Sequence, residues 1–455
     1  MNRKSRASRT AFVYQLIIFA GLLAPPSFAS APVGDMPFPR LGALAMGAKD
    51  YQREEYRAEL SRADLVVLGF YRGWRNDGMT VRDVLQDLKR RNQDILLGTY
   101  TSVSEVFITG ATRDITEKIE RERGPGGAGR DWWARNKDGE RISTWPNTFD
   151  VNITEFAKPD SNGDRFPEYM AKRYYSIYFR DIPEFDFVFL DIARIGPKGS
   201  PDWNGDGVND SRENDTSKTW WRQGIINYVE KLRSLDPSLF FIGNTTTWRE
   251  YDIPQYHQVF DGGLMERLIG ASYSYEGSNS DGTVNRWGSW SMMMDVYRSQ
   301  KAQMRDPAVM LFTMAGQVDD YPLMRYGLTS CLLDDGFFAF IDVENVHSSN
   351  PWFDEYAVEL GAALDLPPTE PWRNGVYRRD FENGVVLVNP RKNGPQTLQL
   401  EPGLKRFLGS QDPSHNNGQR VETITLADRD GIILLRDGPR AAKPSPPTGL
   451  YIADQ

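Results

Sequence analysis

The sequence predicts an α/β fold, a (β/α)8 barrel of the TIM type followed by a small C-terminal β-sandwich. Eight short apolar runs, rich in aromatic and β-branched residues, alternate with longer stretches that suit helices. Near Pro367-Pro368 this rhythm ends, and short segments separated by turn signals follow. Alternating buried strands and helices imply a parallel sheet, and eight such units in about 330 residues fit a closed barrel.

The eight predicted strands are the apolar runs themselves, because a strand buried on both faces is apolar at nearly every position. A single run cannot be told from part of a buried helix, so the prediction depends on their number and order. In chain order the strands are expected at residues 41–46, 65–71, 95–101, 187–193, 239–245, 263–268, 309–315 and 336–342. Helices are expected between them, among others at 81–90, 169–179 and 224–233.

The chain divides into four parts. Residues 1–29 read as a signal peptide, with four basic residues, an apolar segment at 11–24 and small residues before position 30. An uncleaved anchor is the alternative, but the apolar segment falls short of the ~20 residues that a span needs. The barrel is assigned to 36–366, the β-sandwich to 370–437 and a proline-containing flexible tail to 438–455. A secreted or periplasmic protein is therefore expected.

The β-sandwich prediction depends on five short strand-like segments. They are expected at 376–379, 385–389, 397–400, 421–425 and 431–436, with a hairpin signal at Asn383-Gly384. Within the barrel, the connection between the third and fourth strands is long and contains the glycine-rich segment 123–130. A loop of this size on a barrel rim is expected to shape a binding cleft.

Charge and rare residues exclude several function classes. The formal net charge is −8, and loss of the four basic leader residues would bring it to about −12, which disfavours nucleic acid and anionic membranes as partners. No protein partner is indicated. Cys331 is the only cysteine, so no internal disulfide can form, and its leucine neighbours predict a buried thiol. With only His257, His347 and His415, a zinc hydrolase such as a deacetylase is disfavoured, and no organic cofactor is expected.

Two acidic residues stand where catalytic groups of a barrel are expected, at the carboxyl ends of strands. Asp191 ends the fourth predicted strand, and Glu266 lies in the sixth, within Leu264-Met-Glu-Arg267. Glycosidic bonds are usually cut by such a pair. The alternative for each is a structural ion pair with Arg194 or Arg267. Weaker carboxylate candidates are Asp342, Glu344 and Glu276.

Polar and aromatic side chains after other strands are expected to bind the substrate. The predicted substrate-binding residues are Tyr71, Arg72, Tyr100, Arg194, Asn244, Trp248, Gln317 and Asp342. Flat faces for sugar rings could come from Trp132, Trp133, Trp145, Trp248, Trp287 and Trp290, with ordinary packing as the alternative for each.

A calcium loop is predicted after the fourth strand. Asp202, Asn204, Asp206, Gly207 and Glu213 match the D-x-[DN]-x-[DN]-G-x5-E template, and the Val208 carbonyl would be a further ligand. The ion would brace the loop rather than take part in bond cleavage. The alternative is an Asx-rich turn that binds nothing. The segment 160–164 repeats only half of the pattern, and a turn without metal is expected there.

These features resemble a known group of proteins. Phe189-Leu-Asp191, Gly263-Leu-Met-Glu266, the Asp-x-Asn-x-Asp-Gly insertion and the appended β-domain resemble the glycosyl hydrolase-like TIM barrels over residues 38–366. The chain looks closest to hypothetical glycosyl hydrolase family 15, with the endo-α-1,4-polygalactosaminidases as more distant relatives. The resemblance implies a barrel glycosidase with Asp191 and Glu266 as its acidic pair. The related α-galactosidase-type barrels carry the nucleophile and the acid/base on strands four and six, which would make Asp191 the nucleophile.

The sequence thus predicts a secreted glycoside hydrolase that acts on an oligo- or polysaccharide, with retention at the anomeric carbon. The alternative is a non-catalytic carbohydrate-binding barrel, which would keep the tryptophans without a working acid pair. The two differ in whether Asp191 and Glu266 face each other across the mouth of the barrel.

Overall fold

The central element is an eight-stranded parallel sheet, seen in a computed structural model that describes residues 33–71, 74, 77–107, 112–122, 132–245, 253–270, 274–276 and 288–438. Its strands, in spatial as well as chain order, are β1 (Gly42–Ala45), β2 (Leu65–Leu68), β3 (Leu96–Thr101), β6 (Phe187–Leu190), β7 (Phe240–Gly243), β8 (Gly262–Ile269), β9 (Val309–Gly316) and β10 (Phe337–Asp342). The sheet closes where Leu41 bridges Phe338, whose backbone N–H donates to the Arg40 carbonyl at 2.8 Å. The predicted (β/α)8 barrel is confirmed, with one strand in each of the eight apolar runs.

Helices follow most of the strands. They are α1 (Glu54–Leu60), α2 (Val81–Arg91), α5 (Asp215–Leu235), α6 (Trp290–Gln303) and α7 (Tyr321–Leu332), with the single turns η3 (Pro254–Tyr256) and η4 (Asp354–Ala357). A further turn, η1 (Val33–Asp35), precedes β1. Side-chain caps define where several begin. At α2, Thr80 and Asp83 form a reciprocal capping box. Asn214, Ser289 and Asp320 cap α5, α6 and α7 in one direction only, each side chain accepting a backbone N–H.

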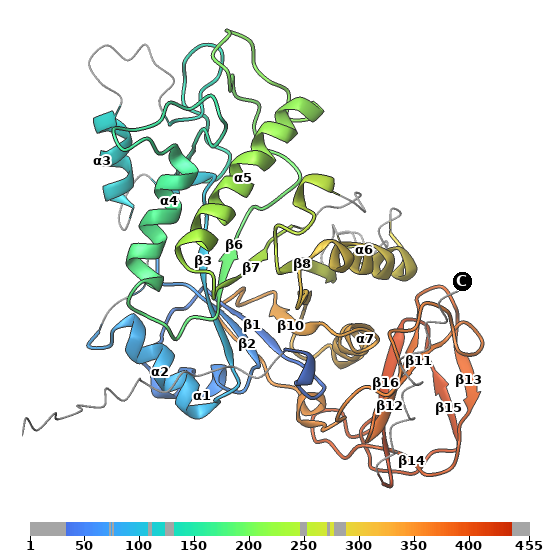
Figure 1. The fold of residues 1–455 in the computed structure, drawn as a ribbon. Helices are drawn as coiled ribbons and strands as arrows, with labels where there is room; N and C mark the ends of the chain where they lie inside the picture. Colours follow the sequence, from blue (N-terminus) through green and yellow to red (C-terminus); the bar gives the residue numbers. More distant parts are fainter. Residues whose placement is uncertain are drawn as a thin grey trace, which may run out of the picture.

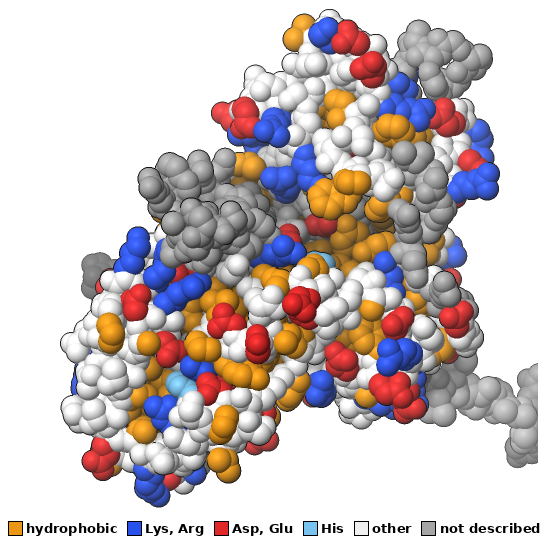
Figure 2. All heavy atoms as spheres, turned by 180° about the vertical axis from the view of Figure 1, so that it is seen from behind, with side chains coloured by type: hydrophobic (Ala, Val, Ile, Leu, Met, Phe, Trp, Pro, Cys, Tyr) orange, Lys and Arg blue, Asp and Glu red, His pale blue; other side chains and the backbone are white. Residues whose placement is uncertain are grey.

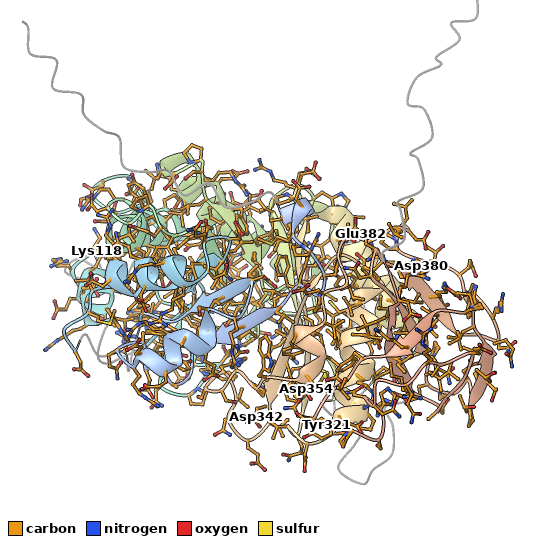
Figure 3. All side chains as sticks on the ribbon, turned by 90° about the horizontal axis from the view of Figure 1, so that it is seen from below. Lys118, Tyr321, Asp342, Asp354, Asp380 and Glu382 are labelled. Atoms are coloured by element: carbon orange, nitrogen blue, oxygen red, sulfur yellow. The ribbon has the colours of Figure 1, made fainter. Side chains whose placement is uncertain are left out.

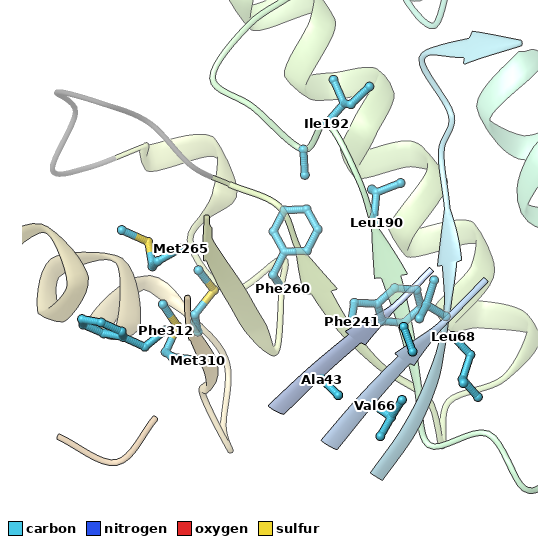
Figure 4. Close-up of a cluster of buried hydrophobic side chains, with 14 of the residues drawn as sticks. Ala43, Val66, Leu68, Leu190, Ile192, Phe241, Phe260, Met265, Met310 and Phe312 are labelled. Atoms are coloured by element: carbon cyan, nitrogen blue, oxygen red, sulfur yellow. The ribbon is translucent and has the colours of Figure 1, made fainter. Parts of the chain in front are cut away.

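Strand side chains alternate between the barrel interior and the layer under the helices. Phe187 and Phe189 pack inside the barrel, whereas Val188 and Leu190 belong to the outer core. Figure 4 shows part of that outer core, with Leu68, Leu190, Phe241 and Phe260 between strands and helices. The period of two follows from the pleat of a strand. It also decides which residues can reach the mouth.

The long connection between β3 and β6 forms an insertion at the carboxyl ends of these strands, the teal and green segment at the top of Figure 1. It contains β4 (Glu105–Phe107), α3 (Arg113–Glu122), β5 (Thr148–Asp150) and α4 (Phe166–Tyr174), which continues into the π-helical turn η2 (Tyr175–Phe179). The antiparallel pair β4 and β5 was not predicted, because three residues are too few to show a period.

The C-terminal β-domain has a four-stranded sheet, β11 (Tyr377–Asp380), β12 (Gly384–Asn389), β16 (Asp430–Arg436) and β14 (Leu404–Arg406), facing a pair, β13 (Gln396–Gln399) and β15 (Thr423–Leu426). The hairpin predicted at Asn383-Gly384 joins β11 to β12. One sheet face packs on α7, which Figure 1 shows between the barrel and β16. Strand β14 was not predicted, and it has only three residues.

Two further expectations can be compared with the structure. Cys331 is buried in α7, as predicted, and burial raises the pKa of its thiol far above the usual range. In the described part of the chain, no helix combines the length and the apolar character needed to cross a bilayer. The predicted signal peptide and all but the first residue of the predicted tail lie outside the described residues.

Candidate active site

The inward register of the three neighbouring strands β6, β7 and β8 brings polar side chains together at the mouth of the barrel. Asp191 continues the inward series of Phe187 and Phe189, and Asn244 follows Ile242 in the same register. Glu266 likewise follows the inward Leu264 on β8. Because carboxyl ends of parallel strands share one end of the barrel, these side chains converge there. The sequence could predict this because each residue stands at an even spacing from an apolar inward one.

Asp191 accepts three hydrogen bonds. The Tyr100 hydroxyl donates to its Oδ2 at 2.7 Å, and the Asn244 side-chain amide donates to its Oδ1 at 3.0 Å. Its own loop adds the Ile192 backbone N–H, 2.8 Å from Oδ1. Donors on both oxygens stabilise the ionised carboxylate and fix its orientation. The predicted alternative, an ion pair between Asp191 and Arg194, is not among the contacts that the described residues show.

Asn244 connects the two predicted catalytic carboxylates. Its Nδ2 lies 3.0 Å from Asp191 Oδ1 and 3.1 Å from Glu266 Oε2. A side-chain amide carries two N–H donors, so one nitrogen can serve both acids. The two oxygens consequently lie within about 6 Å of each other, on the same side of the mouth. Asp191 and Glu266, which are far apart in the chain, face the same small volume.

Glu266 lies at an irregular point of β8. The pairing with β9 shifts between Met265 and Ile269, and Arg267 adopts a positive φ of 53°. The Thr313 hydroxyl stabilises this bulge, since it donates to the Met265 carbonyl and accepts from the Arg267 N–H. Arg267 Nε is 3.8 Å from Glu266 Oε1, a loose ion pair. Bulges often re-aim a side chain beside an active site.

Two tyrosines form one wall of the mouth. The rings of Tyr71 and Tyr100 are 4.9 Å apart, and the Lys49 ammonium lies 4.1 Å from the centroid of Tyr71. Burial, together with the nearby charge of Asp191, raises the pKa of Tyr71 to about 12. The same two causes raise the pKa of Tyr100 well above its usual range. Both phenols therefore keep their protons at neutral pH and act as donors.

His347 lies near the mouth, although it is not among the residues predicted to form the site. It lies in the loop after β10, and burial, followed by the charge of Arg267, lowers its pKa to about 4, while Asp191 opposes the shift. The loop comes close to the end of β1, where Gly47 N–H donates to the His347 carbonyl at 2.7 Å. A side chain at Gly47 would collide with Ser348. Its position in the loop after the last barrel strand, at the carboxyl end of the barrel, was the signal that could have identified it.

Asp342 was predicted to bind substrate, but its register points elsewhere. It is in phase with Phe338 and Phe340 of the outer core rather than with the inward Ile341. Its carboxylate accepts hydrogen bonds from Glu344 N, Asn345 Nδ2 and Ser349 Oγ. Asp342 therefore orders the loop that carries His347.

Glu105 is a second unexpected group near the pair. It lies on β4, opposite Asp150 of β5. Burial raises the pKa of its carboxyl to about 7; Lys198 opposes the shift, while Asp150 and Asp191 add to it. No pattern in the sequence marks Glu105, because the hairpin that carries it is too short to predict. Lys198 in turn lies 4.6 Å from the ring centroid of Trp145, whose side chain is exposed.

The remaining predicted residues divide into three groups. Arg194 and Gln317 follow β6 and β9, and no described side-chain contact links them to the carboxylates. Arg72, Trp248 and Trp287 lie outside the described residues. Among the tryptophans, Trp132, Trp133 and Trp290 are buried in the core, so ordinary packing explains them, whereas Trp145 is exposed.

Glu276, a weaker catalytic candidate, is fully buried and paired. Its carboxylate lies 3.0 Å from Arg391 Nε and 3.5 Å from Arg429 Nε, two arginines of the β-domain. Burial nevertheless raises its pKa. Glu344, the other weak candidate, is exposed in the loop after β10.

The predicted calcium loop is held by its own acidic side chains. Asp202 accepts the backbone N–H groups of Gly205, Asp206 and Gly207 at 2.7 to 3.0 Å. Asn204 donates to Asp206, and Glu213 is exposed and contacts Arg212. Among the described residues, no three acidic, histidine or cysteine side chains converge as metal ligands. These contacts are those of an Asx-rich turn, and the calcium ion stays a prediction. The turn expected at 160–164 is present, with Asp160 accepting two backbone N–H groups.

The mouth of the barrel opens into a recess. Figure 2 shows it from behind, below the insertion, with hydrophobic and acidic side chains in it. A (β/α)8 barrel that collects two carboxylates at the carboxyl ends of its fourth and sixth strands has the architecture of the glycoside hydrolase barrels. The chain belongs to hypothetical glycosyl hydrolase family 15, whose model matches residues 109–385, more than half of its length.

Solved structures with a similar fold are glycoside hydrolases of low sequence identity. They include the glycoside hydrolase domain of PelA from Pseudomonas aeruginosa (17% identity, TM-score 0.38, covering 68% of this chain and 94% of that one). Others are the GH36 α-galactosidase AgaA from Geobacillus stearothermophilus (10%, 0.42, 88% and 56%) and an α-amylase from Lactobacillus plantarum (10%, 0.48, 89% and 99%). No curated protein sequence matches the chain. The family assignment depends on the family model alone.

Proposed function

We propose that this protein is a retaining glycoside hydrolase in which Asp191 is the nucleophile and Glu266 the general acid/base. The observation that carries the proposal is the shared contact with Asn244, which holds both carboxylates at one point of the mouth. Retaining enzymes keep their two carboxyl groups about 5–5.5 Å apart, whereas inverting ones leave about 6.5–9.5 Å for a water. Two oxygens that share one nitrogen donor favour the shorter separation.

The proposed reaction has two steps. Asp191 attacks the anomeric carbon, and the bond to the leaving oxygen breaks as Glu266 gives that oxygen its proton. In the second step Glu266, now ionised, takes a proton from water, and the hydroxide oxygen replaces Asp191 at the anomeric carbon. The sugar leaves as a hemiacetal, and both acids regain their starting states.

Neighbouring side chains support these roles. Tyr100 and the Ile192 N–H hold Asp191 in a fixed orientation, so attack requires no rearrangement of the carboxylate. Asn244 also donates to Glu266 and keeps that carboxylate close to Asp191. Lys49, Arg267 and His347 add polar groups around the mouth that suit a substrate rich in hydroxyls.

The substrate that we propose is an oligo- or polysaccharide. Trp145 is 54% exposed on the insertion, and it connects through Lys198 and Glu105 to the surroundings of Asp191. An exposed indole near polar side chains suits the apolar face of a pyranose ring. We also propose that the chain is exported, on the strength of its basic and apolar N-terminal segment.

A reducing-sugar screen over soluble polysaccharides tests the function. We expect release of reducing ends by the parent protein, and a loss of about 10³-fold or more in Asp191→Asn and Glu266→Gln. The anomer formed first, followed by proton NMR, separates retention from inversion. Glycan binding without product, unaffected by Asp191→Asn, would instead identify a non-catalytic carbohydrate-binding barrel.

A further inference from the structure

A second cavity lies in the β-domain, away from the barrel mouth. Its volume is about 670 Å³, and its lining comes from the segment that leaves the barrel, from β11, and from the carboxyl ends of β13 and β16 with the residues that follow β13. Figure 3 shows Asp380, which lines it, at the opposite end of the molecule from Lys118 of the insertion. Small-molecule sites typically occupy about 300–1,000 Å³. The cavity is thus large enough for one or two sugar rings.

The cavity is the charged end of the sandwich interior. On β16, Ile432 and Leu434 pack in the apolar core between the two sheets, and Arg436 continues the same face. On β11, Arg379 reaches α7, where it donates to the Leu332 carbonyl, so Arg378 and Asp380 point to the other side. The inner face of a sandwich is ordinarily apolar along its whole length. Here it changes to charged residues where the cavity begins.

These charged side chains form a fixed network. Arg378 donates to Asp380 at 2.9 and 3.0 Å and to Glu401 at 2.5 and 2.9 Å. Arg436 contacts the same two carboxylates, yet its buried Nε has no hydrogen-bond partner among the described residues. The two arginine side chains are only 10% and 11% exposed. Buried ion pairs contribute little net stability compared with apolar packing, so stability alone does not account for the network.

The balance of charges indicates the class of ligand. Arg373, Arg378 and Arg436 line the cavity together with Asp365, Asp380 and Glu401, so the formal charges cancel. Hydrogen bonds from Arg378 lower the pKa of Glu401 to about 2, which keeps it ionised. A neutral cavity with many donors and acceptors suits a neutral molecule with many hydroxyl groups, and it suits an anion or a cation poorly.

An aromatic wall completes the cavity. The guanidinium of Arg378 lies 4.8 Å from the ring centroid of Trp372 and orients the indole. Arg373, 4.3 Å from the same centroid, donates to the Gln399 carbonyl at 3.3 Å and is exposed, so its guanidinium has further N–H groups for a ligand. An indole next to planar charged groups is the combination that binds the apolar face and the hydroxyl edge of a sugar ring.

We propose that this cavity is a second carbohydrate-binding site, which takes a neutral mono- or disaccharide unit through Trp372, Arg378, Asp380, Glu401 and Arg436. It would hold a glycan on the β-domain while the barrel mouth acts on another part of the same glycan. The proposal does not depend on hydrolysis, because none of these residues belongs to the barrel strands.

Calorimetric titration of the full-length protein tests the site. The Asp191→Asn background prevents turnover, and the probes are glucose, galactose, N-acetylglucosamine, N-acetylgalactosamine, maltose, cellobiose and lactose. We expect at least one to bind with a Kd on the order of 1 mM, and Trp372→Ala or Glu401→Gln to weaken that binding about tenfold or more. Arg373→Ala, a change at an exposed position, is the variant to use if either of these fails to fold, and it too is expected to weaken binding, because it removes a donor from the cavity.

Arg420→Ala is the matched control, because Arg420 is an exposed arginine of the same domain, paired with Asp437 and outside the cavity. It is expected to leave sugar binding unchanged. Three results would overturn the proposal: no sugar of the panel binds, the cavity variants bind as the parent does, or inorganic phosphate and citrate bind there in place of sugars. Binding and hydrolysis are measured separately, so the titration can be interpreted even if the protein hydrolyses no polysaccharide.

Discussion

At the scale of single residues, the site depends on one amide. Asn244 reaches Asp191 and Glu266 with the same nitrogen, so it sets their separation and keeps two like charges apart from direct contact. The two residues before it, Ile242 and Gly243, are buried at the end of β7 and leave it little freedom. Asn244 was predicted to bind substrate; its contacts suit it instead to position the two carboxylates that we propose as catalytic groups.

Replacing Asn244 should lower activity without unfolding the protein. We expect Asn244→Ala to lower kcat/KM about 10²-fold, because both carboxylates lose a fixed donor. Asn244→Asp should lower it further, since a third carboxylate would repel the other two. Steady-state kinetics on the best polysaccharide of the screen provide the measurement. Asn227→Ala, at a surface position of α5 bonded to Gln223, is the control. Equal activity of Asn244→Ala and the parent would contradict the positioning role.

Glu105 should make stability depend on pH. Burial raises the pKa of its carboxyl to about 7 in the folded chain, from an ordinary value of 4.5. The folded state therefore prefers the protonated form. The contribution of Glu105 to stability is greatest below pH 4.5, falls as pH rises to about 7 and is constant above that.

Glu105→Gln should remove this effect. Compared with the parent, we expect the variant to be more stable by on the order of 2 kcal/mol near pH ~8 and equally stable near pH ~4. Urea unfolding at the two pH values measures the difference. Glu155→Gln, an exposed position on the same insertion, should show no such dependence. A difference of the same size at both pH values would show that the charge of Glu105 is not the cause.

At the scale of elements, loops and one β-bulge position the side chains around the mouth. Asp342 orders the loop that brings His347 to the mouth, and the bulge in β8 aims Glu266. The loop at 202–213 is held by Asp202, which bonds the backbone at three positions. The predicted calcium ligands all lie within this loop, so the loop alone decides whether the ion binds.

Calcium is expected to stabilise the protein through this loop. If the ion binds the folded state only, a concentration a hundred times the Kd adds about 2.7 kcal/mol to the free energy of unfolding. Thermal unfolding of chelator-treated protein, with and without added calcium, measures this. Asp202→Ala should abolish the response, whereas Asp138→Ala, at an exposed position on the insertion, should keep it. An unchanged Tm in the parent would identify the loop as a turn without metal.

At the scale of the whole molecule, the β-domain supports the barrel beside β8. Arg391 pairs with the buried Glu276 and donates to the Gly288 carbonyl, and Arg429 donates to the Glu276 carbonyl. Glu276 lies next to Ile269 at the end of β8, the strand that carries Glu266. The β-domain thus holds both described ends of the connection between β8 and α6.

Removing Arg391 should destabilise the protein. Arg391→Ala leaves a buried carboxylate with one arginine fewer, and we expect a loss of about 3 kcal/mol in the free energy of unfolding. Adding Glu276→Gln to Arg391→Ala should restore part of that loss, because the unpaired charge is then gone. Urea unfolding of the two single variants and the double variant gives the coupling energy. Strict additivity would mean that the ion pair does not couple the domains.

The sequence was sufficient to predict the strands of the barrel. The eight apolar runs can be recognised because a strand buried on both faces is apolar at nearly every position. The residues in phase with them follow because side chains alternate in direction along a strand. Asp191, Glu266, Tyr100 and Asn244 were predicted to face the mouth on that basis. The strands of the hairpin that carries Glu105 have only three residues each, too few to show a period in the sequence. Asp342 was misplaced because it is in phase with the outward-facing residues of β10.

The sequence by itself determined the barrel, its strand order and which acids end at its open side, since these depend on local patterns of polarity. Only the tertiary structure decided the contacts between distant segments. These are Asn244 between the two carboxylates, His347 beside the end of β1, and the charged cavity that Trp372 shares with Arg436. The physical reason is that such contacts depend on how separate elements meet in space, and no spacing along one segment records that.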